Sequence, residues 1–568
     1  MKSLSRLLIV LISLCSINSY AVVDMRTSNF SKTFLDMHIK GTGLDLSIKR
    51  TYNSRSVFNG IFGYGWCSDY ETTLAINSDS SVLVTECGGG LESLYKSSSF
   101  KQKNILQINK KIIKEVKKRN PDLSSRYLAN LRKKLKTNAF LREEFAKNLN
   151  IKGEVHAFTK YIIDGRKNEY LVKKNNLFTR YLKEGIKQEF NLKGQLVSIV
   201  SKLGNRLNIK RKKDLISEVS DTKGRRLQFF YDNILKKVTK LQGSNGATAA
   251  YAFKGNDLIR STDENKVTVH YQSDSQHNLT KIIYPNKTFV AMSYNLSKDW
   301  VTSFTNQKGC VEKYSYGESK KNPLDHYWSQ VIKKCKRKVT HQAKYEFFHK
   351  TRKNGSRYLY RSRFLVNNLY TEITYHSKFG RPTKVQKGRR IVKLKYNRIG
   401  QIILKDEISK VTSYKYNKQC NTVSNTQERF FAYLPKKTKK KSRKIAYVKK
   451  ERHKINSRFK YNKACNISWA KNSAGLTAKV TYDNAGRIKE ILDHTRKNIL
   501  IGYENRFGKP ATITRPGLGT LRLAYTKSGE IKAGKKSTTS LFVANQIIQT
   551  FNNFLKVIGP VSTQNKTL

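Results

Sequence analysis

Cysteine is the residue whose number and spacing say most about the chemistry of this chain. The 568 residues include seven cysteines, and one of them, Cys15, lies in an N-terminal segment that we expect to be removed. The other six are Cys67, Cys87, Cys310, Cys335, Cys420 and Cys465. An even number of cysteines in an exported chain favours disulfide chemistry, although six cysteines allow fifteen pairings.

Pairing of sequence neighbours would close the shortest loops. We therefore predict three disulfides, which are Cys67–Cys87, Cys310–Cys335 and Cys420–Cys465. Buried free thiols are the alternative. A zinc site is disfavoured, because the sequence contains no CxxC pair and its histidines are scattered. We predict no metal and no cofactor.

The residue types that usually perform catalysis form no recognisable group. His38, His156, His270 and His277 stand in strand or turn contexts without a nucleophile nearby. The sequence contains no HExxH, GxSxG, Walker, GxGxxG or paired HxE motif. Its 40 acidic residues are dispersed, so no glycosidase-like pair of carboxylates can be nominated. We predict no catalytic residues and a non-enzymatic protein, with glycan cleavage as a remote alternative.

The first 21 residues have the layout of a secretory signal peptide cleaved after Ala21. A short basic start precedes an apolar run, Leu7–Leu14, that is too short to span a bilayer. A helix retained in the mature fold is the alternative. A lipoprotein is disfavoured because Leu14, rather than a small residue, precedes Cys15. We expect export without a transmembrane span, to the cell surface or outside the cell, with the periplasm as the alternative.

The charge of the chain is strongly positive. Its 112 Lys and Arg against 40 Asp and Glu give a formal net charge of +72, which favours polyanionic partners such as lipopolysaccharide, acidic glycans or nucleic acid. The densest basic run is Pro435–Lys454, and its candidate polyanion contacts are Lys436, Lys437, Lys439, Lys440, Lys441, Arg443 and Lys444. An ordinary solvated loop is the alternative. Dedicated nucleic-acid binding is disfavoured, because no nucleic-acid motif accompanies the charge.

Tyrosines recur along the chain at steps of 20 to 23 residues. The three groups are Tyr231, Tyr251, Tyr271 and Tyr294; Tyr375, Tyr396 and Tyr416; and Tyr461, Tyr482, Tyr503 and Tyr525. In the unit Ala478–Asn498, alternating polar and apolar residues flank "DNAG", where Asp opens a turn and Gly486 allows positive φ. Each unit is predicted to be a strand, a tight turn and a second strand. Side by side, such hairpins form a mainly β fold, one long coiling antiparallel sheet over 181–531, rather than a row of sandwich domains.

These units, together with "RTYNSRS", "GIFGYGW" and "SDYETTL", resemble the Rhs and YD-repeat proteins of bacteria, whose repeats also occur in animal teneurins. The resemblance covers roughly 25–100 and 181–531 and implies a partial or complete β-shell around a hollow interior. Its N-terminal signature residues are Arg50, Tyr52, Asn53, Gly63, Gly65 and Trp66. Rhs toxins end their shell with an Asp-Pro motif and a toxin domain. Here no Asp-Pro occurs, and about forty residues follow the last repeat.

The region around the signature is predicted to be a hydrophobic core that is fastened by a disulfide. Tyr52, Phe58, Phe62, Tyr64 and Trp66 would form an aromatic cluster, with glycines allowing sharp turns. A platform for sugar rings is the alternative. The Cys67–Cys87 bridge would join a strand at Asp69–Ile76 to a returning strand at Val82–Glu86.

Two helical regions interrupt the β pattern. Helical spacing of apolar residues predicts a two- or three-helix insert at about 101–150, within an N-terminal β-region 22–180, with Asp122 as a cap. The tail 532–568 follows the repeats, and it contains a predicted amphipathic helix at 540–558, ended by Gly559 and Pro560. We expect this helix to dock on the sheet, with recruitment of a partner as the alternative.

Two functions from different classes follow. The first is an exported, non-enzymatic YD-repeat scaffold that binds anionic glycans or cell surfaces. The second is a shell that encapsulates or presents a protein cargo encoded separately, which the resemblance to toxin-bearing relatives implies.

Overall fold

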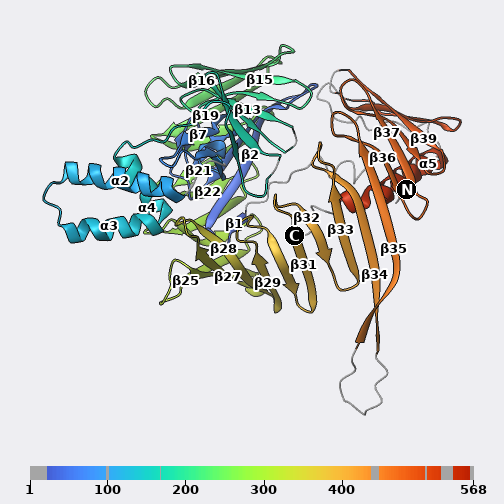
Figure 1. Cartoon of the computed structure of the whole chain (residues 1–568). Helices are drawn as coiled ribbons and strands as arrows, with labels where there is room; N and C mark the ends of the chain where they lie inside the picture. Colours follow the sequence, from blue (N-terminus) through green and yellow to red (C-terminus); the bar gives the residue numbers. More distant parts are fainter. Residues whose placement is uncertain are drawn as a thin grey trace, which may run out of the picture. The chain divides into compact units, whose positions relative to one another are not determined.

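The computed structural model describes residues 22–97, 102–166, 168–183, 185–435, 447–505, 508–525 and 541–562 (Figure 1). The predicted signal peptide with its cleavage site at Ala21 lies outside these residues, and so do all seven predicted polyanion contacts from Lys436 to Lys444. The described chain forms two compact modules. The N-terminal module contains Ser19–Ile39 and Leu44–Pro382, and the C-terminal module contains Lys40–Gly43 and Thr383–Leu568.

Thirty-five strands, β7 to β41, follow one another in a single antiparallel sheet order. In the N-terminal module they are β7 (Thr73–Ile76), β8 (Val82–Thr85), β9 (Glu92–Ser97), β10 (Lys160–Ile162), β11 (Tyr170–Lys174), β12 (Leu177–Tyr181), β13 (Lys187–Phe190), β14 (Leu196–Val200), β15 (Arg206–Lys212), β16 (Leu215–Asp221), β17 (Arg226–Tyr231), β18 (Val238–Gly243), β19 (Thr248–Lys254), β20 (Asp257–Thr262), β21 (Thr268–Ser273), β22 (Leu279–Ile283), β23 (Phe289–Asn295), β24 (Trp300–Thr305), β25 (Val311–Glu318), β26 (His326–Cys335), β27 (Lys338–Thr351), β28 (Arg357–Val366) and β29 (Leu369–Tyr375).

The strands of the C-terminal module are β30 (Pro382–Lys387), β31 (Arg390–Tyr396), β32 (Ile402–Asp406), β33 (Lys410–Tyr416), β34 (Val423–Pro435), β35 (Tyr447–Tyr461), β36 (Ile467–Asn472), β37 (Thr477–Tyr482), β38 (Ile488–Asp493), β39 (Asn498–Tyr503), β40 (Pro510–Arg515) and β41 (Gly519–Arg522). The predicted fold, a mainly β chain of successive antiparallel hairpins with a small helical insert and a C-terminal helix, is confirmed.

The side chain that opens each repeat turn also holds it. At Asp483, the carboxylate accepts the backbone N–H of Arg487 at 2.8 Å, and Gly486 has a φ of 73°. At Asp274, Oδ1 accepts the N–H of Asn278 at 2.9 Å. A short acceptor at the first position therefore fixes a turn four residues long, as the repeat pattern predicts.

The repeat tyrosine closes the other end of the hairpin in many of the repeats. The Tyr503 hydroxyl donates to the backbone carbonyl of Ile488 at 2.8 Å, and Tyr482 donates to Ile467 in the same way at 2.7 Å. The same kind of bond is made by Tyr231, Tyr294, Tyr316, Tyr416, Tyr461 and Tyr525. A β-bulge falls at Tyr482 and at Tyr503. Because bulges increase strand twist, the tyrosine period also spaces points of extra twist along the sheet.

A separate four-stranded sheet precedes the repeats. It has the order β1-β2-β3-β6, formed by β1 (Val22–Asp24), β2 (Asn29–Ile39), β3 (Leu46–Asn53) and β6 (Trp66–Ser68), and the short ribbon β4 (Asn59–Gly60) and β5 (Gly63–Tyr64) stands beside it. Its buried residues Phe30, Met37 and Ile48 belong to the same core as the apolar residues of the repeat strands. We call these four strands the N-terminal sheet. It packs against β16, β19 and β24.

The strand predicted over Asp69–Ile76 is shorter than expected. Asp69–Glu71 form a 3₁₀ turn, and β7 begins at Thr73. The Glu71 carboxylate accepts the backbone N–H of Ser68 at 2.9 Å, which caps the turn. This local bond competes with the extended conformation, so the strand begins only after the turn.

Three helices lie between the paired strands β9 and β10, where the sequence predicts an insert. They are α2 (Gln102–Arg119), α3 (Ser125–Thr137) and α4 (Ala139–Asn148), with a core of their own that includes Ile112, Leu131 and Leu135. The predicted cap at Asp122 is wrong. Ser124 caps α3 instead, because its hydroxyl accepts the N–H of Tyr127 at 3.2 Å.

The C-terminal helix α5 (Leu541–Ser562) packs on β36 to β41 of its own module. Val543, Ile547 and Val557 are buried against the sheet. The helix continues four residues past the predicted end at 558, so Gly559 and Pro560 do not end it as predicted. Within the described residues, no helix is both long and apolar enough to cross a bilayer.

Candidate functional site

Arg50, the first residue of the RTYNS motif, lies completely buried on β3 (0% exposed). Its Nε is 2.8 Å and its Nη2 3.2 Å from the two carboxylate oxygens of Asp36 on the neighbouring strand β2. Nη2 also donates to the Ser261 hydroxyl and the Tyr271 hydroxyl, each at 3.0 Å. One guanidinium therefore connects the N-terminal sheet to β20 and β21, more than two hundred residues later in the chain.

Aromatic rings enclose the guanidinium. Its central carbon lies 4.2 Å from the centroid of Trp66 and 5.2 Å from that of Phe34. Burial alone would lower the pKa of Arg50, but Asp36 and the adjacent tyrosines raise it well above its ordinary value. The charge is therefore permanent, and it is compensated by the carboxylate and by ring faces.

Two repeat tyrosines are diverted to this site. The Tyr251 hydroxyl donates to Asp36 Oδ2 at 2.9 Å, and the Tyr271 hydroxyl accepts from Arg50. Seven of their counterparts in other repeats donate to a backbone carbonyl, as Tyr231 does to Ile216 at 2.7 Å. Burial raises the pKa of Tyr251, so its hydroxyl stays protonated and able to donate. The repeats that carry Tyr251 and Tyr271 therefore receive Asp36 and Arg50. We call the contacts of these two tyrosines with Asp36 and Arg50 the Arg50 socket.

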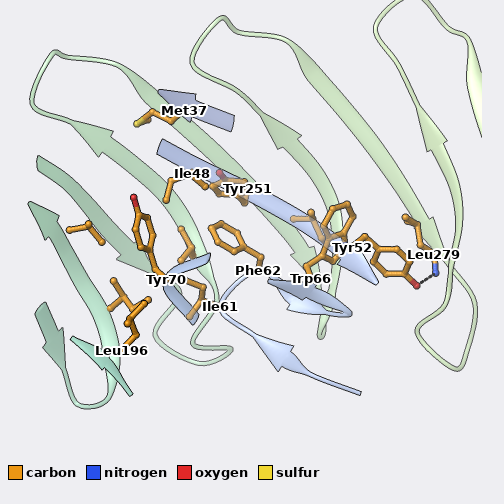
Figure 2. Close-up of a cluster of buried hydrophobic side chains, with 14 of the residues drawn as sticks. Met37, Ile48, Tyr52, Ile61, Phe62, Trp66, Tyr70, Leu196, Tyr251 and Leu279 are labelled. Carbon is orange, nitrogen blue, oxygen red and sulfur yellow. Dashed lines mark hydrogen bonds between the residues drawn. The ribbon is translucent and has the colours of Figure 1, made fainter. Parts of the chain in front are cut away.

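The aromatic residues of the signature region separate into two settings, and Figure 2 shows the buried one, which contains Tyr52, Phe62 and Trp66. The rings of Tyr52 and Trp66 lie 5.1 Å apart, and the Tyr52 hydroxyl accepts the N–H of Leu279 at 2.9 Å. Phe62 lies 5.1 Å from Tyr251, and it is fully buried. The ring of Tyr64 instead lies against the partly exposed ring of His277, with centroids 4.8 Å apart and the planes tilted by 31°. Because the faces of the first three rings are covered, they form core, and a sugar platform is not available there.

The signature glycines permit close approach. Gly63 has a φ of 96°, and a Cβ there would lie 2.6 Å from the carbonyl oxygen of Asn256. Gly65 has a φ of 74°, and a Cβ would lie 2.7 Å from the ring of Tyr52. Asn53 ties the following loop, because its Nδ2 donates to the carbonyl of Gly89 at 2.8 Å. Of the six signature residues, Arg50, Tyr52, Gly63 and Trp66 contact the repeats, whereas Asn53 and Gly65 make their contacts within the N-terminal segment.

The six cysteines form the three predicted disulfides. The Cα atoms of the paired residues are 5.3 Å apart for Cys67–Cys87, 4.4 Å for Cys310–Cys335 and 5.5 Å for Cys420–Cys465. In the register of β25 and β26, Val311 is opposite Lys334, so the second pair closes the end of a ladder. The first pair fastens the end of β6 to the turn after β8.

A buried carboxylate lies beside the first disulfide loop. Glu71 accepts the backbone N–H groups of Ile61 at 2.8 Å and Ser68 at 2.9 Å. Burial raises the pKa of Glu71 to about 7, although these bonds favour the carboxylate. Lys237, from a repeat turn, donates to the Gly60 carbonyl at 2.8 Å. These contacts hold the β4–β5 ribbon against the repeats.

The candidate histidines do not converge. His277 Nδ1 lies 2.9 Å from Asp257, and His38 Nε2 lies 2.9 Å from Asp45, while His156 and His270 are exposed. No group of three or more His, Cys, Asp or Glu suited to a metal ion occurs in the part of the chain that the structure describes. The polar groups of the Arg50 socket bond mainly to one another, which is the arrangement of a structural tie.

Sequence reasoning missed Asp36 and Ser261 as members of this site. Asp36 stands in the strand "NFSKTFLDMHI" as a lone acid among apolar residues, which is the signal that could have pointed to a buried partner. Ser261 carries no such signal, because it is one small residue in an ordinary repeat strand.

Comparison with known families gives two matches. A model described as "Teneurin YD-shell" matches residues 177–535, and one described as a domain of unknown function (DUF6531) matches residues 21–92. No curated protein matches the chain.

Among solved structures, "Crystal Structure of TcdB2-TccC3" aligns with 90% of this chain and 34% of its own at 8% identity, with a TM-score of 0.34. TcdB2-TccC3-TEV aligns with 92% of this chain and 31% of its own at 9% identity, with a TM-score of 0.24. A Photorhabdus luminescens Tc holotoxin pore with a TccC3 mutation aligns with 88% and 31% at 8% identity, with a TM-score of 0.21. The chain spans about a third of the length of these solved chains.

Proposed function

Since the chain belongs to the teneurin YD-shell family, whose model matches residues 177–535, we propose that it is an exported, non-enzymatic scaffold that binds anionic glycans or anionic cell surfaces. The observation that carries the proposal is the surplus of bases. Even if each of the 40 acidic residues neutralised one base, 72 of the 112 bases would keep an uncompensated charge. Lysine is rarely buried, so most of this charge is at the surface.

The described edges of the basic segment fit this interpretation. Lys449, Lys450, Arg452 and Lys454 on β35 are exposed. Glu451 stands among them, and it lies 3.8 Å from Arg429 on the paired strand β34. A strand that presents a row of exposed bases is a surface that a long polyanion can follow. The seven bases from Lys436 to Lys444 lie in the connection between these strands, and their role as contacts remains part of the proposal.

Export is supported by the disulfides. Three disulfides in one chain fit an oxidising compartment better than a reducing one. Cleavage after Ala21 predicts a mature chain that begins at Val22, and N-terminal sequencing of the secreted or periplasmic protein tests this. A mature chain that retains Lys2 would contradict it.

The test of function is binding of the oxidised mature protein, residues 22–568, to lipopolysaccharide, acidic glycans, neutral glycans and DNA over a salt titration. We expect acidic glycans to bind at 0.15 M salt, where charges more than about 8 Å apart are largely screened, and neutral glycans not to bind. Equal release of all polyanions at one salt concentration would indicate a nonspecific coat. Release of sugars from cell-wall material would contradict the non-enzymatic part.

A second candidate function is a shell that holds a separately encoded protein. It is favoured by β27 and β28, where the rings of Tyr345 and Phe364 lie 5.3 Å apart and stay half-buried. Apolar rings that the chain itself leaves partly uncovered could contact a cargo polypeptide. Co-purification of one co-expressed polypeptide in 1 M salt would favour this function over binding through charge.

A further inference from the structure

A cavity of about 580 Å³ lies where the helical insert meets the hairpin loop between β7 and β8. Four lysines from three separate segments line it: Lys96 at the end of β9, Lys110 and Lys111 on α2, and Lys152 after α4. Within the described residues, no ion pair joins any of the four to a carboxylate. The fold therefore gathers four bases from separate segments around one space.

Two carboxylates line the same cavity. Asp79 belongs to the β7–β8 loop, and its Oδ1 accepts the N–H of Ser81 at 3.0 Å. Glu154 follows α4, and its side chain is exposed. The lining therefore combines four ammonium groups with two carboxylates, and the mixture differs from a purely basic patch.

Hydrogen bonds and a close backbone contact fix the wall of the cavity. The N–H of Ser78 lies 3.1 Å, and its hydroxyl 2.7 Å, from Glu143 Oε2 on α4. The Glu154 N–H donates to the Ser80 hydroxyl at 3.1 Å. At Gly153, a Cβ would lie 2.5 Å from the backbone nitrogen of Ser80, so only glycine allows the two segments to touch. The insert and the loop are thus held at a fixed separation.

We propose that this cavity binds an acidic sugar, meaning a sugar unit that carries a carboxylate or phosphate group beside free hydroxyls; the proposal rests on the proposed glycan-binding function. The volume falls in the usual range for small-molecule sites, about 300–1,000 Å³. The lysines supply point charges for the acidic group, and Asp79 and Glu154 supply acceptors for hydroxyl protons. Inorganic phosphate satisfies the lysines alone, whereas an acidic sugar satisfies both sets.

Nucleic acid fits this lining less well. Single strands are usually held by stacking of bases on exposed aromatic rings. Tyr161 lines the cavity, but its side chain is only 1% exposed, which leaves its ring without a face for stacking.

The test compares two variants of the full oxidised chain with the same loss of charge. The cavity variant is Lys110→Gln/Lys111→Gln/Lys152→Gln, and the control is Lys133→Gln/Lys134→Gln/Lys136→Gln, three exposed lysines on α3 away from the cavity lining. Isothermal titration calorimetry in 0.15 M salt measures binding of digalacturonic acid, glucosamine 6-phosphate, inorganic phosphate and neutral cellobiose. We expect the cavity variant to lose at least tenfold in affinity for both acidic sugars, and the control variant to stay within twofold of the wild type.

The outcomes separate the cavity from the general function. Equal losses in both variants would overturn the site and leave the proposed glycan binding intact, because binding would then follow total charge. Failure of the wild type to bind any acidic glycan would overturn the proposed function itself. Inorganic phosphate binding as tightly as the two sugars would reduce the cavity to an anion site and overturn sugar recognition. Binding to phosphatidylglycerol vesicles that needs the cavity lysines, yet resists competition by digalacturonic acid, would assign the cavity to lipid headgroups instead.

Discussion

Arg50→Met is the substitution that tests the Arg50 socket most directly. It removes the guanidinium and leaves Asp36, which is 3% exposed, with a buried charge and one remaining bond from Tyr251 at 2.9 Å. Loss of one partner from a buried ion pair costs about 3–5 kcal/mol, because the other charge stays desolvated without compensation. We therefore expect the free energy needed to detach the N-terminal sheet from the repeats to fall by this amount.

The companion variant Arg50→Met/Asp36→Leu removes both charges. Apolar replacement of a complete buried pair is often neutral or stabilising, so we expect it to recover most of the loss. The measurement is hydrogen exchange of the β2 amides, Asn29–Ile39, since a chain with two modules need not unfold in one step. A double-mutant cycle with Asp36→Leu alone then gives the coupling energy.

Arg166→Met is the matched control. Arg166 pairs with Glu169 at 3.0 Å but is 42% exposed, and such pairs contribute at most about 1 kcal/mol. Unchanged exchange of β2 in Arg50→Met, or additive losses in the cycle, would refute the view that the Arg50–Asp36 pair, through its bonds to Tyr271 and Tyr251, holds the N-terminal sheet on the repeats.

Three further predictions concern single positions. Gly63→Ala places a Cβ 2.6 Å from the carbonyl oxygen of Asn256 at a φ of 96°, so we expect a loss of about 2 kcal/mol or more in unfolding free energy by denaturant titration. Glu71 has a folded pKa of about 7 against an ordinary value of 4.5. Its stabilising contribution is therefore complete below pH 4.5 and is lost as pH rises through 7, by about 3 kcal/mol in all. Glu71→Gln should remove this part of the pH dependence in thermal melts from pH 4 to 8. Asn109 is 3% exposed on α2, and neither of its amide atoms has a partner among the described residues; Asn109→Leu should slow hydrogen exchange in α2, by about 1 kcal/mol in opening free energy, and faster exchange would contradict this.

The repeat period predicted the hairpins because the residues that form each hairpin bond to partners nearby in the sequence. The Asp that opens a turn and the tyrosine that closes the hairpin lie within one or two units of their partners, as Asp483 does to Arg487 and Tyr503 to Ile488. The disulfides follow for the same reason. Antiparallel register brings Cys310 opposite Cys335, so the shortest loop is also the geometrically allowed one.

The Arg50 socket could not be predicted in this way. Asp36 and Tyr251 are 215 residues apart in the chain. The repeat that contains Tyr251 differs little in sequence from the other repeats. Which repeat receives the N-terminal sheet depends on packing of the whole module. The cavity lined by Lys96 and Lys152 could not be predicted either, since its lining combines the β7–β8 loop, the end of β9, helix α2 and the segment after α4.

The distribution of acidic residues connects the fold with the proposed function. Asp221, Asp263 and Asp493 each use Oδ1 to accept two backbone N–H groups in their turns. Asp36 is hydrogen-bonded to Arg50 inside the Arg50 socket. Asp221 also pairs with Arg225 through Oδ2 at 2.7 Å, but the Oδ1 atoms of the three turn residues are occupied by backbone N–H groups, and Asp36 is paired with a buried arginine. The bases of the sheet and of the insert therefore keep a field that the fold does not cancel, so removal of surface lysines should change polyanion binding with little effect on the turns that define each repeat.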